Sequence, residues 1–235
     1  VLSWDPSPSS DVELYSIYRS STLDGFDFPI AQTNKTTWTD KNAGLGNGDS
    51  YFYIVRAVDK TRLTDSNTNK AAKLVMPLDA GLRLVSVPIA LSNTSVSSAL
   101  QTLKYDVVWY HNNSDLADPW KSYNPSKQFN DLTNVNHTTA FWVYVTESSN
   151  ITVAGAVPTA TDIFLKEGWN LVGYPSFVER NVSEALSGID YEMIEGYDAA
   201  LPPQYLRLLH DADLMRPGYG YWVKVGSDTI WSVSN

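Results

Sequence analysis

The stretch of sequence that decides the fold occurs twice, as GLRLVSVP at residues 81–88 and as GWNLVGYP at residues 168–175. Each copy is a short apolar run that ends at a proline, which cannot donate a hydrogen bond to a continuing strand ladder. The two copies lie 87 residues apart. We therefore interpret each copy as an early strand of a β-rich unit, and the pair as a sign of internal duplication.

Other segments repeat in the same order and at similar spacing. The aromatic run 141–145 aligns with 221–225 at a spacing of 80 residues, and Val96, Leu100 and Tyr105 align with Val182, Leu186 and Tyr191 at 86. The shrinking spacing indicates shorter loops in the second copy. Each copy predicts a strand, a short helix, a second strand, a polar loop, an aromatic strand and a final strand. For the helix N-caps we expect Asn93 or Thr94 in the first copy and Asn181 in the second.

The first 76 residues have a different pattern, in which short alternating apolar runs are separated by turn residues. The clearest runs are 14–18 and 51–58, and such period-two runs are typical of an antiparallel sandwich. The fold class predicted from the sequence is therefore mainly β, with a sandwich followed by two small α+β units. The expected domains are residues 1–76, 77–157 and 158–235, joined by linkers near 77–79 and 156–158.

The first segment resembles a fibronectin type III domain. The stretch LSWDPS at residues 2–7 is similar to the second strand of that family, with Trp4 as its core tryptophan, and residues 11–20 are similar to the third strand. Leu45 and Tyr51 match the corner before the sixth strand. The resemblance implies that the Tyr51 hydroxyl bonds to nearby backbone. The family has one more strand before Trp4, so we expect either an exposed sheet edge or a longer native protein, and favour the latter.

The repeated part resembles a repeat from the C-terminal regions of archaeal and bacterial surface or secreted proteins. The resemblance depends on GWNLVGYP at 168–175 and on RPGYGYWVK at 216–224. The first copy departs from it, with Leu82 in place of the tryptophan and residues 136–140 in place of Pro-Gly-Tyr-Gly. The resemblance implies a structural role, and it implies no activity for this chain.

Composition narrows the classes of function. The chain of 235 residues has a formal net charge of −9, which disfavours nucleic acid as a partner, and its lack of cysteine excludes disulfides and thiol chemistry. No apolar run is long enough to span a bilayer. Six Asn-x-Ser/Thr sequons favour an extracellular or cell-surface location, although chance could supply several of them. The candidate glycosylation sites are Asn34, Asn93, Asn112, Asn136, Asn150 and Asn181.

We predict no catalytic residue, no metal site and no cofactor. His111, His137 and His210 have no second ligand at a chelating spacing. The densest acid cluster comprises Asp190, Glu192, Glu195 and Asp198, and a facing pair of carboxylates could hydrolyse a glycoside. Alternation along the predicted strand instead places Asp190 and Glu192 on its solvent face. Asp211 and Asp213 alone offer a calcium ion too few oxygens.

The aromatic residues are better candidates for ligand binding, because exposed rings stack on the apolar faces of sugars. We predict possible ligand contacts at Trp109, Trp120, Tyr123, Trp142 and Trp222. The alternative for each is ordinary core packing, above all for Trp142 and Trp222, whose strands could be buried on both faces.

The leading hypothesis is a non-catalytic extracellular module of a larger surface or secreted protein, with a spacing, adhesive or lattice-forming role. Its partners would be other domains of the same chain or of a surface layer. The alternative is a carbohydrate-binding accessory region of a secreted hydrolase, with polysaccharide as the partner. A catalytic domain with a new kind of site is the third reading.

Overall fold

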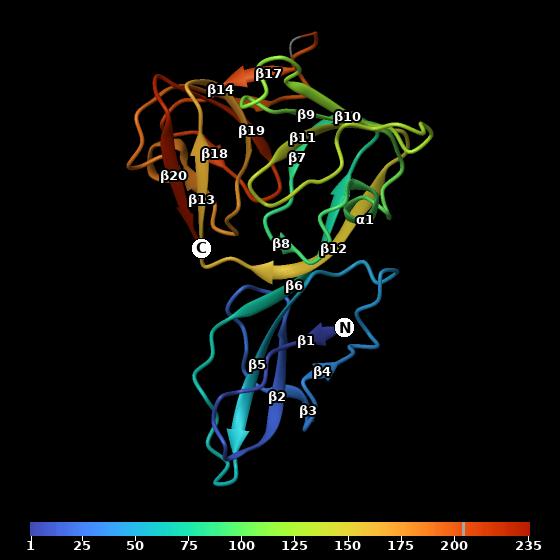
Figure 1. Cartoon of the computed structure of the whole chain (residues 1–235), viewed down its shortest axis with the longest axis vertical. Helices are drawn as coiled ribbons and strands as arrows, with labels where there is room; N and C mark the ends of the chain where they lie inside the picture. Colours follow the sequence, from blue (N-terminus) through green and yellow to red (C-terminus); the bar gives the residue numbers. More distant parts are fainter. Residues whose placement is uncertain (204) are drawn as a thin grey trace. The chain divides into compact units, whose positions relative to one another are not determined.

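The computed structural model describes residues 1–203 and 205–235 and shows a mainly β, antiparallel chain, which confirms the predicted fold class (Figure 1). It divides into two compact units. Unit 1 comprises Val1–Val75 and Val153–Val157, and unit 2 comprises Met76–Thr152 and Pro158–Asn235. In the described part of the chain, no helix has the length or apolar character to cross a bilayer.

Unit 1 is built on one antiparallel sheet. The strands β3, β2, β5 and β6 lie in that order, with the end of β12 beside β6, and β1 pairs separately with β4. Figure 1 shows β2, β5 and β6 side by side in blue to cyan. Their bounds are β1 Leu2–Ser3, β2 Val12–Ser20, β3 Pro29–Thr33, β4 Thr37–Trp38, β5 Tyr51–Asp59, β6 Lys70–Leu78 and β12 Ser149–Val157. The strands predicted at 14–18 and 51–58 are thus confirmed within β2 and β5.

One detail that the fibronectin resemblance implied is wrong. The Tyr51 hydroxyl donates to the side chain of Asp49, at 3.1 Å, and not to backbone. Leu45, which the resemblance placed at the corner before the sixth strand, is 57% exposed. Asp40 links the chain before β5 to β2 and β5, because its carboxylate accepts hydrogen bonds from Arg19 at 2.8 Å and from the Tyr53 hydroxyl at 3.1 Å.

The Asp40 carboxylate is stabilised in its charged form. Burial alone raises its pKa, but the backbone N–H of Asn42, the Arg19 guanidinium and the Tyr53 hydroxyl all hydrogen-bond the carboxylate and hold its pKa below its usual value. This contribution to stability is present above the pKa of the unfolded chain and is lost as the pH falls through the folded pKa.

The predicted linkers at 77–79 and 156–158 overlap the ends of two strands, and Asp79 and Pro158 follow those ends. Pro77 and Leu78 belong to β6, and Ala156 and Val157 belong to β12. The side chain of Pro77 is exposed, in keeping with the positions at which strands tolerate a residue that has no N–H to donate. The short segment Val153–Val157 belongs to unit 1 instead of to the repeated part.

Unit 2 contains two four-stranded sheets with the same strand order. Sheet A runs β10-β9-β11-β7 and sheet B runs β17-β16-β19-β14. The strands of sheet A are β7 Gly81–Ser86, β9 Tyr105–His111, β10 Trp120–Tyr123 and β11 Ala140–Val145. Those of sheet B are β14 Gly168–Gly173, β16 Tyr191–Tyr197, β17 Leu206–Leu208 and β19 Gly220–Val225. The smaller elements are β8 Ala90–Leu91, α1 Val96–Ala99, β13 Ala160–Leu165, β15 Arg180–Asn181, α2 Val182–Ala185, β18 Leu214–Met215 and β20 Thr229–Ser234.

The two sheets also share their strand registers. Leu84 lies opposite Trp142 in sheet A, and Leu171 lies opposite Trp222 in sheet B. Each sheet has a β-bulge at the same place. The pairing of β9 with β11 skips residue 106, and the pairing of β16 with β19 skips residue 192. Residues in the same register position of the two sheets are called counterparts below.

Each one-turn helix is capped by the side chain before it. Asn181 Oδ1 accepts the backbone N–H of Glu184 at 2.8 Å, which confirms the predicted cap of α2. The cap of α1 is Ser95, so the prediction of Asn93 or Thr94 was wrong. Asn93 instead accepts the N–H of Ser95, and this turn delays the start of the helix.

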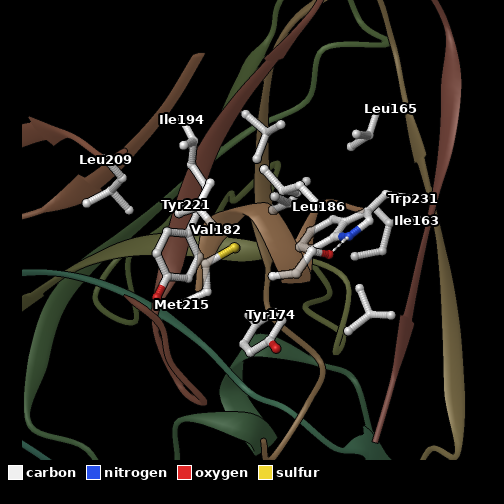
Figure 2. Packing of buried hydrophobic residues seen from close by; sticks show 14 of the residues in the cluster. Ile163, Leu165, Tyr174, Val182, Leu186, Ile194, Leu209, Met215, Tyr221 and Trp231 are labelled. Carbon is white, nitrogen blue, oxygen red and sulfur yellow. Dashed lines mark hydrogen bonds between the residues drawn. The ribbon is translucent and has the colours of Figure 1, made fainter. Parts of the chain in front are cut away.

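The core behind sheet B is centred on Trp231, which is fully buried (Figure 2). Its indole N–H donates to the carbonyl of Ala185 at 2.6 Å, and its ring stacks on Tyr174 at a centroid distance of 6.3 Å. The hydrogen bond fastens the end of α2 to β20. A buried indole needs such a partner, because an unpaired N–H would cost free energy of about 1–3 kcal/mol.

The outer faces of the two sheets meet at small residues. A Cβ atom at Gly220 would lie 2.5 Å from the Cβ of its counterpart Ala140, and a Cβ at Gly173 would lie 2.9 Å from that of its counterpart Ser86. Glycine is therefore required at both positions for the backbones to approach. Because each residue meets its own counterpart, the contact is isologous, like that of a symmetric dimer.

Backbone hydrogen bonds repeat this symmetry. The N–H of Ser86 donates to the carbonyl of Gly218 at 3.0 Å, and the N–H of Gly173 donates to the carbonyl of Thr138 at 2.9 Å. Each bond joins the end of the first strand of one sheet to the loop that precedes the aromatic strand of the other. The two sheets therefore form one body.

Candidate functional site

Four aromatic side chains gather where one end of sheet A meets sheet B. Trp222 lies at the centre, with ring centroids 5.1 Å from His111, 6.0 Å from Trp120 and 6.4 Å from Trp169. His111 and Trp120 are in turn 5.0 Å apart. We call these four residues the aromatic cluster.

Strand alternation positions the rings. On β19 the neighbours Tyr221 and Val223 point into the core behind sheet B, so Trp222 points towards sheet A. His111 and Trp120 are directly opposite each other on β9 and β10, at the edge of sheet A. The cluster therefore draws its rings from both sheets and depends on the contact between them.

The cluster is partly open to solvent. Trp120 is 46% exposed, while His111, Trp169 and Trp222 are partly buried. Edge-to-face contacts of this kind hold rings in fixed orientations and add about 0.5–1.5 kcal/mol each beyond the area they bury. The arrangement presents a preformed apolar surface that a flat ligand can cover without ordering the side chains first.

A polar pocket of about 290 Å³ adjoins the cluster, and His111 belongs to both. It is lined by side chains from the end of β9, the loop after it, the loop before β11, and the strands β13 and β14. The lining residues are Tyr110, His111, Asn112, Asn113, Ser114, Thr138, Thr139, Asp162, Ile163, Phe164, Lys166, Asn170, Leu171 and Val172. This polar pocket offers amide, hydroxyl, carboxylate and ammonium groups within one small volume.

The floor of the polar pocket is fixed by a buried asparagine. Asn170 donates from Nδ2 to the carbonyl of Lys166 at 2.8 Å and accepts the Lys166 N–H at 2.9 Å. The Lys166 ammonium is paired with Asp228 at 2.8 Å. On the opposite wall, Asn113 Nδ2 donates to the carbonyl of Glu167 at 3.2 Å and joins the loop after β9 to sheet B.

The His111 side chain is neutral at pH 7, because burial lowers its pKa from its usual value. Its Nδ1 atom is buried and, in the part of the chain that the structure describes, has no hydrogen-bond partner. A buried polar atom without a partner costs about 1–3 kcal/mol.

The other predicted aromatic contacts lie elsewhere. Trp142, the counterpart of Trp222, packs in the contact between the sheets, 5.5 Å from the ring of Tyr197. Trp109 is directly opposite Trp142 and partly buried. Tyr123 lines a separate pocket of about 340 Å³ beside Tyr105. Of the five predicted residues, Trp120 and Trp222 belong to the aromatic cluster, and Trp109 and Trp142 form a separate pair.

The six sequons are found in different surroundings. Asn34, Asn93, Asn136 and Asn150 are exposed, and Asn112 and Asn181 are partly buried. The Asn181 side chain caps α2, and Asn112 lines the polar pocket. A glycan on either of these two would compete with the role that the side chain already has.

The charged candidates do not converge. Asp190 and Glu192 are both exposed, as predicted, and Glu192 pairs with Lys224 at 2.6 Å. Asp211 accepts a hydrogen bond from the Tyr191 hydroxyl at 2.9 Å. Within residues 1–203 and 205–235, no three histidine or acidic side chains are grouped as metal ligands would be.

Sequence reasoning missed His111 and Trp169 as parts of the cluster. Alternation from Trp109 along β9 already placed His111 on the same face as Trp142. No pattern in the sequence said that sheet B would pack against that face and bring Trp169 and Trp222 to it.

Comparison with known proteins gives a partial similarity. Over 80 residues, or 33% of its length, the chain is 36% identical to an amylopullulanase of Thermoanaerobacter thermohydrosulfuricus. The similar region spans 5% of that enzyme, so this chain is similar to a small part of a much longer protein. No family profile matches the chain. No solved structure matches it either.

Proposed function

We propose that this chain is a non-catalytic accessory region of a larger secreted protein that acts on polysaccharide, and that its aromatic cluster binds an α-glucan. The observation that carries the proposal is the convergence of Trp120, Trp169, Trp222 and His111 from two sheets onto one partly exposed surface. The partial similarity to an amylopullulanase supports glucan as the ligand, because that name denotes action on pullulan.

The chemistry of the cluster suits a sugar. A pyranose ring has an apolar face of C–H groups and a rim of hydroxyls, so it stacks on an indole and directs its polar groups outwards. The Trp120 indole offers such a face at 46% exposure, and Trp222 and His111 hold it in place. Binding sites of this kind combine apolar surfaces with a few placed polar groups, which the adjoining polar pocket supplies.

A binding role needs no catalytic group. Glycoside hydrolysis usually requires two carboxyl groups on either side of the scissile bond. Asp162 is the single acid among the pocket-lining residues, and one of its oxygens already accepts a hydrogen bond from Ser232 at 2.6 Å. We infer from this that the polysaccharide is held here and cut elsewhere.

The proposal extends to the origin of the two units. We infer that unit 1 is a fibronectin type III-like sandwich and that sheets A and B arose by duplication of one β-rich unit. The shared strand order and the matching β-bulges support the second inference. An extracellular location fits the six sequons and the partial similarity to an enzyme of polysaccharide breakdown.

The test is the retention of the intact chain in affinity electrophoresis with pullulan or amylose in the gel. We expect retention with both, and we expect Trp120→Ala to weaken binding roughly tenfold, which corresponds to about 1.4 kcal/mol. The matched control is Phe129→Ala, which removes a ring that is 84% exposed and lies outside the cluster. An intact chain that migrates equally with and without glucan would contradict the proposal and favour a spacing or adhesive role.

A further inference from the structure

We propose that the polar pocket beside the aromatic cluster binds a single hexose at the end of a glucan chain, while the next sugars of that chain lie on the cluster. This inference rests on the proposed function and assigns a preference within it. It predicts that the affinity for a glucan depends on whether the glucan has a free chain end, and not only on its number of sugars.

The volume of the polar pocket limits the size of the ligand that it can hold. At about 290 Å³ it lies at the lower end of the range for small-ligand sites, roughly 300–1,000 Å³. A single sugar ring fits such a volume better than an oligosaccharide does. The inferred arrangement places the terminal residue of the chain in the pocket and the following sugars on the cluster.

The position of the pocket links it to the cluster. His111 lines the pocket and is 5.0 Å from the ring of Trp120 and 5.1 Å from that of Trp222. A sugar in the pocket and a sugar on the exposed face of Trp120 are thus separated by a single side chain. Neighbouring residues of one glucan chain have a similar separation.

The lining of the pocket matches the groups of a hexose. Asp162 offers a carboxylate that accepts from hydroxyls, and Lys166 offers an ammonium that donates to them. Asn112, Ser114 and Thr138 add neutral donors and acceptors. Apolar contact for the C–H face comes from Tyr110, Phe164 and Leu171.

The pocket is also formed in advance. Asn113, which lines the pocket, donates a hydrogen bond to the Glu167 carbonyl, and the lining residues Asn170 and Lys166 are joined by another. Little entropy is then lost on binding, which favours a small ligand that makes few contacts.

The deciding experiment compares a linear with a cyclic glucan of the same size. Maltoheptaose has two chain ends and β-cyclodextrin has none, yet both present seven glucose rings to the aromatic cluster. We expect tryptophan-fluorescence titration of the full chain to show about tenfold tighter binding of the linear ligand, since about 1.4 kcal/mol separates the two in that case.

Two variants locate the preference in the pocket. Asp162→Leu removes the carboxylate, and Ser114→Phe fills the pocket from its exposed rim. Each should abolish the difference in affinity between maltoheptaose and β-cyclodextrin. The matched control is Ser232→Ala, which removes the hydrogen bond to Asp162 but keeps the carboxylate in the pocket, so the linear preference should persist.

The outcomes separate this inference from the proposed function. Equal affinities for the two ligands, both lowered by Trp120→Ala, would overturn the end-binding inference and leave glucan binding by the cluster intact. A linear preference that both pocket variants preserve would overturn it as well. Failure of the intact chain to bind either ligand would overturn the proposed function itself.

Discussion

Sheets A and B have the same strand order and the same bulge, but they differ at the edge. In sheet A the edge position opposite His111 is Trp120, which is 46% exposed. In sheet B the counterpart position holds Leu206, which packs against the contact between the sheets. The comparison shows that the edge residue of the same strand arrangement can have two different roles. At one end of the interface the edge residue closes the contact, and at the other it presents an aromatic surface to solvent.

The largest effect that we expect comes from the core behind sheet B. Trp231→Ala removes a fully buried ring and leaves the carbonyl of Ala185 without its partner, so it should lower the free energy of unfolding by about 3–5 kcal/mol. Urea unfolding measures this. The neighbouring control Ile230→Ala changes a side chain that is 57% exposed and should have little effect. Equal effects of the two variants would contradict the structure of this core.

The next largest effect tests the symmetry of the contact between the sheets. Gly220→Ala places a Cβ 2.5 Å from the Cβ of Ala140 and should destabilise unit 2 by about 1–3 kcal/mol. Adding Ala140→Gly removes this contact but keeps the 2.9 Å approach to the Leu84 side chain, so it should restore part of the loss. A double variant that is less stable than either single variant, measured by thermal unfolding, would show that these counterparts do not face each other.

Acid should lower the free energy of unfolding of unit 2 through two histidines in the half that contains sheet A. Burial lowers the pKa of His111 and of His137 below the usual value of about 6.5, and both belong to the part of unit 2 that contains sheet A. The unfolded chain then takes up protons first, so stability is constant above about pH 6.5 and falls as the pH drops towards the folded pKa. The double variant His111→Phe, His137→Phe should lose this fall in a pH series of urea unfolding. An unchanged slope between about pH 6.5 and pH 5 would refute the assignment.

The smallest effects concern surface ion pairs whose cations are counterparts. Lys121 lies 2.9 Å from Asp115 and 3.0 Å from Asp118, and Arg207 lies 3.3 Å from Asp213. Exposed ion pairs contribute little to stability, so Lys121→Met and Arg207→Met should each leave the midpoint of urea unfolding almost unchanged. High salt should remove any remaining difference in stability between each variant and the unchanged protein. A larger loss for one variant would show that its ion pair does more than neutralise charge.

Much of the fold could be predicted from the sequence, because periodicity reports local structure well. The alternating runs at 14–18 and 51–58 lie in strands, and Asn181 caps its helix. The predictions that depended on long-range geometry were less successful. Pro77 was read as a linker, although a strand can hold a proline whose side chain is exposed, and the Tyr51 hydroxyl found a carboxylate that no local rule anticipates.

The candidate site was only half visible in the sequence. Alternation showed that Trp222 points away from the core behind its own strand, but it could not show what lies opposite. The approach of the sheets depends on Gly173 and Gly220, whose lack of a side chain carries no hydrophobic signal. His111 was considered as a metal ligand and rejected, whereas its neighbours are two indole rings and a polar pocket.

The crossed backbone bonds from Ser86 to Gly218 and from Gly173 to Thr138 give each sheet a partner that it cannot supply alone. A shortened polypeptide that ends before sheet B would expose Leu84, Ala140 and Trp142. A second copy of sheet A could not replace sheet B, because it would set Ala140 against Ala140 and Ser86 against Ser86, where one partner has to be glycine. The two glycines of sheet B therefore favour pairing within one chain over association between chains, and the covalent link adds to this by keeping the proper partner at high local concentration.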